Sequence, residues 1–225
     1  EEGRIIYSNI RKFVSYLLSA NVAEILIIFI SVVAGLPLPL TALELLILNL
    51  VTDGAPALAL GLEKGDPDIM QQPPRPPHEP VINREMMWGI AVISLSITFA
   101  TLTTFVVGLR WYPNNLPLAE TMAFATLTFS ELMRACSSRS ERYSLFSIGI
   151  FSNRWMQVAV ASSFIILVTI IYLPFLRPVL GMYPLGLREW GLIVSLLFLP
   201  FTVSELYKLF LLRASQRRLR SLETM

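Results

Sequence analysis

The most informative segment of the sequence is Thr41-Ala-Leu-Glu-Leu-Leu-Ile-Leu-Asn-Leu-Val-Thr-Asp-Gly-Ala-Pro-Ala-Leu-Ala-Leu-Gly61. It covers the roughly 20 residues that a membrane-spanning helix needs. Yet it places Asn49, Thr52 and Asp53 at i, i+3 and i+4, which is one face of a helix near its middle. The stretch therefore predicts a membrane helix with a polar face at mid-bilayer.

Two helix-breaking residues follow this polar face directly. Gly54 comes next, and Pro56 removes a backbone hydrogen bond and so frees a carbonyl. Transporters build ion sites from helices that are interrupted at the midplane, where side chains and backbone act together. We therefore expect the helix over 40–61 to be broken near mid-bilayer.

Five other apolar runs accompany this helix, and the composition agrees with them. Of the 225 residues, 54% are hydrophobic and 15% are charged, against about 25% charged in typical soluble domains. The mean hydropathy is +0.62. This excludes a disordered chain, and the single cysteine, Cys136, excludes an internal disulfide scaffold. We expect an all-α membrane protein, a six-helix transmembrane bundle with helices at about 10–35, 40–61, 87–109, 118–135, 156–176 and 190–212.

Basic residues indicate how this bundle is oriented. Cytoplasmic loops carry an excess of lysine and arginine, and fifteen of the 18 basic residues fall on one side of the predicted spans. The other side has Arg110, Arg177 and Arg188. We therefore expect both termini to be cytoplasmic, with a proline-rich loop over 62–86 and a basic tail over 213–225. The net charge of +2 gives no reason to expect a nucleic-acid partner.

The proline-rich loop contains the only low-complexity stretch. Between Asp66 and Pro80 six of fifteen residues are proline, which keeps the chain extended and stiff. Such a loop is either a rigid spacer or a docking surface for another domain. His78 is the only histidine, and no cysteine lies near it, so we expect a solvated side chain rather than a metal ligand.

Polar side chains within the predicted spans need compensation. A mid-membrane carboxylate costs about 2.5–3.5 kcal/mol on insertion scales, so three together cost roughly 8–10 kcal/mol. Hydrogen bonds between helices would account for the amides and the hydroxyl, but carboxylates need protons or cations. Hard oxygen ligands suit calcium, magnesium or manganese, and calcium takes about 6–8 of them. The candidate ligands are Asn21, Glu24, Asn49, Thr52, Asp53 and Glu131.

At these residues the sequence resembles a known family. The matching stretches are 3–12, 19–24, 49–61 with its Asn-Leu-Val-Thr-Asp-Gly run, 66–70 and 73–75. They closely resemble the C-terminal membrane half of calcium-transporting P-type ATPases, from the fifth to the tenth transmembrane helix. The resemblance covers essentially the whole chain and is most specific over the first 80 residues.

The resemblance implies roles for particular residues. In that family the positions that match the six candidate ligands bind transported calcium, and the stiff loop contacts the cytoplasmic phosphorylation domain. This favours docking as the role of Asp66, Asp68 and Arg75. It implies a pump that uses ATP to export calcium from the cytoplasm. Because burial disfavours the charged form of a carboxyl group, we expect protons to replace the released cation and return in countertransport.

Other parts of such a pump do not occur in these 225 residues. There is no Asp-Lys-Thr-Gly phosphorylation motif and no nucleotide-binding domain, and no initiator methionine precedes Glu1. We therefore expect a fragment that cannot hydrolyse ATP alone and has no catalytic residue of its own. Its expected partners are the lipid bilayer, the cytoplasmic domains and the first four membrane helices of the same pump. ATP and magnesium would act in the full-length pump only.

Several alternatives stay open at this stage. Manganese or another cation is an alternative cargo, and a non-catalytic channel or assembly subunit is an alternative function. The expected location is the plasma membrane if the source is bacterial, and otherwise the membrane of an intracellular calcium store. Arg134 stands three residues after Glu131 and so on the same helix face. It is a possible modulator, acting either as a tethered counter-ion to Glu131 or as a side chain that extends to the cytoplasmic interface.

Overall fold

The computed structural model describes residues 1–66, 68–71, 80–141 and 143–223, with side chains as far as Arg213. In these ranges the regular structure is entirely helical, which confirms the all-α fold. The elements are α1 (Glu2–Val33), α2 (Ala42–Ile47), the π-helical segment η1 (Leu48–Thr52), α3 (Gly54–Gly61), α4 (Arg84–Trp111), α5 (Leu116–Ser137), α6 (Leu145–Ile148), α7 (Arg154–Tyr172), α8 (Arg177–Leu180) and α9 (Leu187–Glu223).

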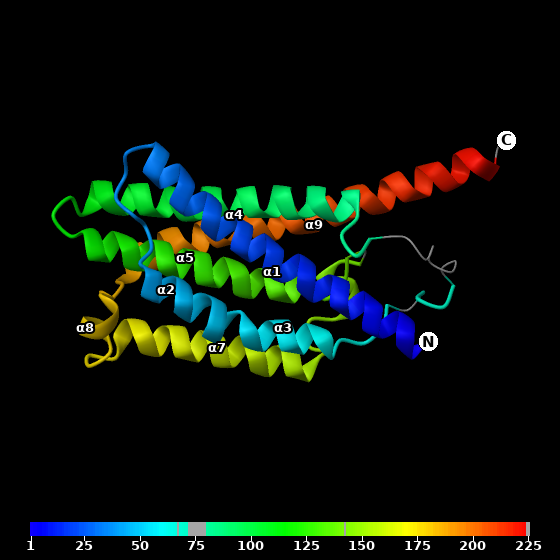
Figure 1. Cartoon of the computed structure of the whole chain (residues 1–225), viewed down its shortest axis with the longest axis horizontal. Coiled ribbons are helices and arrows are strands. Elements are labelled where there is room, and N and C mark those ends of the chain that lie inside the picture. Colours follow the sequence, from blue (N-terminus) through cyan, green and yellow to red (C-terminus); the bar gives the residue numbers. More distant parts are fainter. Residues whose placement is uncertain (67, 72–79, 142, 224–225) are drawn as a thin grey trace.

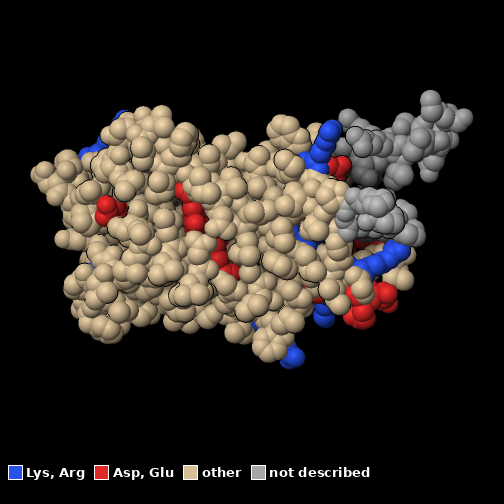
Figure 2. All heavy atoms as spheres, in the orientation of Figure 1, with Lys and Arg blue, Asp and Glu red and all other residues tan. Residues whose placement is uncertain are grey.

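The long helices form one elongated bundle (Figure 1). Helix α1 crosses it obliquely and packs on α4 and α3, while α5 contacts α4, α9 and α7. The first residues of α1 and the last turns of α9 lie at the same end of the bundle, which is called here the terminal end. In Figure 2 most of the visible charge lies toward this end, and a wide uncharged band follows it. A short line of acidic atoms interrupts the band at mid-length.

Five of the described helical segments are long and apolar enough to cross a membrane, namely α1, α2 to α3 taken together, α4, α7 and the 187–213 part of α9. The predicted span over 118–135 lies within α5, which is not among these five. Helix α5 is instead the interior helix of the bundle. Most of its side chains are buried, including several hydroxyl groups that bond back to their own helix.

Three helices begin or end at residues other than those predicted. Helix α1 begins at Glu2 rather than near residue 10, because Asn9 anchors its first turns by donating to the carbonyls of Gly61 and Glu63. Helix α9 continues as far as Glu223 instead of ending near residue 212. Helix α7 ends at Tyr172 rather than 176, since a residue that precedes a proline disfavours helical backbone.

Helices α4 and α5 form a tight hairpin. Its turn is short, and the Asn115 side chain caps α5 by accepting a hydrogen bond from Leu118 N. Further into the bundle the two helices approach closely at Gly108. A Cβ atom added there would lie 3.0 Å from the Cβ and 3.1 Å from the Cα of Ala119. A larger residue at this crossing would therefore push α4 and α5 apart by a few tenths of an ångström.

Arg139, just past the end of α5, joins three segments at the terminal end. Its side chain is 1% exposed. Nε and Nη2 donate to the two carboxylate oxygens of Glu63, at 2.7 and 3.1 Å, and Nη1 donates to the carbonyls of Gly149 and Ile150, at 2.9 Å each. Asn153, the N-cap of α7, also donates to Glu63, at 2.8 Å. These contacts hold the ends of α3 and α5 against the start of α7, and we call them the Arg139 clamp.

Candidate cation site

The predicted break lies in the π-helical segment η1, between α2 and α3. Asp53 N donates to the carbonyl of Leu48, five residues back, at 2.9 Å, and the Thr52 hydroxyl donates to the same carbonyl at 2.8 Å. The carbonyl freed by Pro56 belongs to Thr52. It accepts a hydrogen bond from the Ser163 hydroxyl of α7, at 3.2 Å. The helix is thus interrupted by one wide turn and is not unwound.

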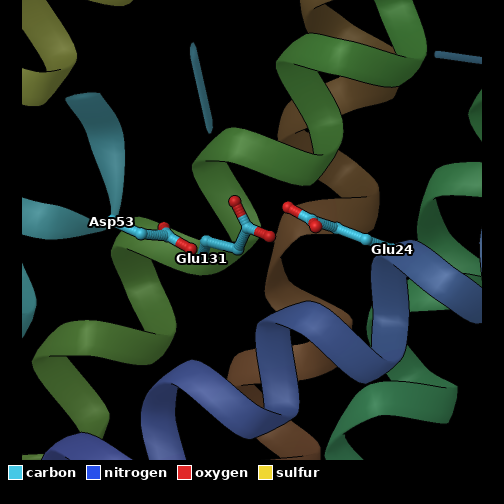
Figure 3. A group of neighbouring side chains, drawn as sticks. All are labelled: Glu24, Asp53 and Glu131. Carbon is cyan, nitrogen blue, oxygen red and sulfur yellow. The ribbon is translucent and has the colours of Figure 1, made fainter. Parts of the chain in front are cut away.

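Three carboxyl groups converge beside this turn. Glu24 comes from α1, Asp53 from the junction of η1 and α3, and Glu131 from α5. One oxygen of each lies within 4.8 Å of the others. Asp53 and Glu131 are fully buried and Glu24 is 7% exposed. Figure 3 shows the carboxyl group of Glu131 between those of the other two residues. We call these residues the carboxylate cluster.

The hydrogen bonds around the cluster satisfy some of its oxygens. Tyr16, fully buried in α1, donates its hydroxyl to Asp53 Oδ1 at 2.8 Å. The Asn49 amide donates to both oxygens of Glu24, at 3.0 and 2.9 Å. Among the described residues, Asp53 Oδ2 and both Glu131 oxygens have no hydrogen-bond partner. A buried ionised carboxylate without a partner is costly, so these three oxygens are the ones that a cation or protons would satisfy.

The other two predicted ligands, Thr52 and Asn21, make their described side-chain hydrogen bonds within their own helices and not to the carboxylates. Thr52 is fully buried, and its hydroxyl donates to Leu48. A donating hydroxyl retains lone pairs that can coordinate a cation. Asn21 is half-buried, and its amide nitrogen donates to the Leu17 carbonyl at 2.9 Å. Hydrogen bonds and proximity therefore join Glu24, Asn49, Asp53 and Glu131, while Asn21 and Thr52 bond to their own helices.

Sequence comparison assigns this chain to a protein family. The family described as "Cation transporting ATPase, C-terminus" has a model that matches residues 37–210. The chain belongs to this family. The matched residues include Asp53 and Glu131 of the carboxylate cluster, whereas Glu24 precedes them. The family and the apolar helices make the chain part of a multi-pass membrane protein.

Curated relatives agree with this assignment. The chain is 40% identical over 200 residues to a calcium-transporting ATPase of Bacillus subtilis, covering 89% of this chain and 22% of the relative. It is 37% identical over 224 residues to calcium-transporting ATPase 1 of Bacillus cereus, covering 93% and 25%. Calcium-transporting ATPase type 2C member 2 of the mouse is 35% identical over 210 residues, covering 93% and 22%. The chain spans about a quarter of the length of these relatives.

Arg134 is buried, and its described hydrogen bond goes to α1 and not to the carboxylate cluster. Its Nη2 donates to the Ser15 hydroxyl of α1 at 3.4 Å, and its Nε has no hydrogen-bond partner in the described part of the chain. No ion pair or hydrogen bond between Arg134 and Glu131 occurs among the described residues. The side chain is only 8% exposed, so it does not extend into solvent either.

The predicted docking loop is described in part. Asp66 lies 3.7 Å from the buried Lys12 ammonium of α1, and Arg4 donates to the Ile69 carbonyl at 2.8 Å. The start of the loop is thus fixed to the first turns of α1, and Asp68 belongs to the same short segment. Two further sequence predictions, for Arg75 and His78, lie outside the described residues.

Sequence reasoning missed two residues beside the cluster. Tyr16 stands two helical turns before Glu24, on the same stripe of α1, and this spacing was the available signal. Ser163 belongs to a helix without any predicted ligand, and it contacts a backbone carbonyl 111 residues away. No local pattern marks such a contact.

Proposed function

We propose that this chain is the ion-binding membrane region of an ATP-driven pump that exports calcium from the cytoplasm. One observation supports this most strongly. Three buried carboxyl groups from three different segments converge within 4.8 Å, and three of their oxygens have no hydrogen-bond partner in the part of the chain that the structure describes. Helix packing alone does not require such an arrangement, because each group costs free energy in the membrane. A divalent cation that is bound and released offsets that cost.

The ligand set suits calcium. Asn21, Glu24, Asn49, Thr52, Asp53 and Glu131 offer carboxylate, amide and hydroxyl oxygens only, and calcium tolerates a flexible shell of about 6–8 such ligands. The calcium-transporting names of the relatives support the same cargo. Manganese also accepts oxygen ligands, so it is the competing ion in the test.

The proposed cycle depends on charge balance within the cluster. A bound divalent cation neutralises most of the charge of the three carboxylates. After release, protons take its place, because the empty cluster is buried and its neutral form is favoured. The pump thus returns protons in exchange for each exported cation. Phosphorylation by ATP, with magnesium, belongs to cytoplasmic domains outside this region. In a bacterium the membrane would be the plasma membrane, and otherwise that of a calcium store.

Metal-dependent phosphorylation of the complete pump tests this proposal. Phosphoenzyme formed from ATP is measured in calcium, in manganese and in chelator, for the native protein and for Glu131→Gln. The control is Glu120→Gln, which changes a half-buried carboxyl on the same helix, outside the cluster. We expect calcium to support phosphorylation better than manganese, Glu131→Gln to abolish this dependence, and Glu120→Gln to keep it.

Two results would contradict the proposal. Unchanged calcium dependence in Glu131→Gln would remove the cluster from ion binding, and a full-length chain without a phosphorylated aspartate would indicate a channel or assembly subunit. Proton countertransport has its own measurement, namely the internal pH of vesicles during calcium uptake. Calcium transport with no proton counterflow at any pH would exclude it.

A further inference from the structure

The carbonyl of Thr52 lacks its regular helical donor. In an α-helix this donor would be the N–H of residue 56, which is proline and has none. Two other carbonyls around the break accept hydrogen bonds from within the same helix. The Leu48 carbonyl accepts from Asp53 N, and the Asp53 carbonyl accepts from Ala57 N at 3.0 Å. A buried carbonyl without a partner costs free energy comparable to a lost hydrogen bond. The wide turn of η1 therefore needs a donor from elsewhere.

Ser163 of α7 supplies that donor. Its side chain is fully buried, and its hydroxyl lies 3.2 Å from the Thr52 oxygen. Serines in membrane helices commonly bond back to their own helix, as the adjacent Ser162 does by donating to Ala159 O at 2.9 Å. The hydroxyl of Ser163 instead crosses to η1. It is thus an interhelical contact at the one carbonyl that Pro56 leaves without a donor.

The π-helical turn determines how the two halves of the broken helix face each other. A π-turn adds about one residue to a helix, so closing it to regular α geometry would rotate the following residues by roughly 100°. Asn49 lies inside the turn and donates to Glu24, while Asp53 follows the turn and accepts from Tyr16. Both contacts need the present rotation.

We infer that Ser163 is a positioning residue for the cation site, and that its hydroxyl holds η1 in the geometry which brings Asn49 and Asp53 to the carboxylate cluster. The inference rests on the proposed function, because it assigns α7 a part in cation affinity. In this arrangement the Thr52 carbonyl is engaged by Ser163 and is not a free ligand. If that carbonyl were instead a cation ligand, Ser163 would compete with the cation, and its removal would strengthen binding.

The test uses the calcium dependence of phosphorylation in the complete pump. Ser163→Ala is expected to weaken apparent calcium affinity roughly tenfold, the size of one buried hydrogen bond. The matched control is Ser162→Ala, which removes a hydroxyl from the adjacent position and is expected to change affinity less than about twofold, because its bond stays within α7. Unchanged or tighter affinity in Ser163→Ala would overturn the inference.

Making Ser163→Ala in a Pro56→Ala variant distinguishes loss of the positioning hydrogen bond from a general loss of folding. Pro56→Ala restores an N–H that can donate to Thr52, so Ser163→Ala should cost less than about twofold when made in Pro56→Ala. An equal loss in both backgrounds would refute the role of the hydroxyl.

Hydrogen exchange of the Asp53 amide, measured in the same protein without calcium, reports on η1 itself. Faster exchange in Ser163→Ala is expected even if the pump carries another ion. Failure of the proposed function would therefore leave this result intact. Unchanged exchange would refute the inference that the Ser163 hydroxyl holds η1 in its present geometry.

Discussion

Replacing Arg139 by methionine is expected to destabilise the bundle strongly, through loss of the Arg139 clamp. Methionine keeps much of the unbranched stem and removes the guanidinium. Glu63, which is only 7% exposed in the native structure, then loses both bonds from Arg139 and retains the one from Asn153. The carbonyls of Gly149 and Ile150 also lose a donor. The dominant cost is the charge of Glu63, which stays buried without its counter-ion.

The magnitude follows from these contacts. Removing one partner of a buried ion pair costs about 3–5 kcal/mol. For a chain of this size each kcal/mol lowers the unfolding midpoint by about 2–4 °C, so the midpoint should fall by roughly 6–20 °C. Replacing both partners removes the unpaired charge. The double variant Glu63→Met with Arg139→Met should therefore recover at least about half of the loss.

Thermal unfolding of the purified membrane protein, followed by tryptophan fluorescence, measures these shifts. Arg84→Ala is the control, since Arg84 is exposed at the start of α4, and it should change stability by less than about 0.5 kcal/mol. A midpoint in Arg139→Met within about 2 °C of the native protein would refute this reasoning. So would a double variant whose loss equals the sum of the two single losses, because the pair would then have no coupling energy.

Three further predictions concern single residues. Tyr16→Phe keeps the buried ring but removes the hydroxyl that donates to Asp53, so apparent calcium affinity should fall about tenfold, as measured by calcium-dependent phosphorylation. Arg134→Asn should leave the number of bound calcium ions per pump unchanged, because the guanidinium forms no ion pair with the carboxylate cluster; an increase in bound radioactive calcium would show that it is a counter-ion after all. Gly108→Ala should cost about 1–3 kcal/mol in thermal unfolding through overpacking, whereas Gly191→Ala, whose added Cβ would meet nothing within 4 Å, should not destabilise.

Much of the fold could be predicted because the length and hydropathy of a segment identify it as a membrane helix. The same holds for the carboxylates, since a charged residue at mid-bilayer is costly wherever its helix packs. The helix break was predictable from Gly54 and Pro56, which act on the local backbone. In each case the physical cause lies in the segment itself, so it can be read from the sequence.

The remaining features depend on distant partners. The hydroxyl of Ser163 meets the carbonyl of Thr52 only because α7 packs against η1, and sequence separation hides this contact. The side chain of Arg134 shares a helix face with Glu131 in spacing, yet it bonds to Ser15 of α1. Spacing determines which face a residue occupies, and packing of the neighbouring helix determines what it contacts.

The polar character of α5 also bears on how the protein is made. Helix α5 is not among the five segments apolar enough to cross a membrane by composition, and it carries both Glu131 and Arg134. A nascent α5 should therefore partition poorly into lipid by itself. Its four-residue connection to α4 and the close contact at Gly108 keep the two helices together, so we expect them to enter the bilayer as a hairpin during biosynthesis.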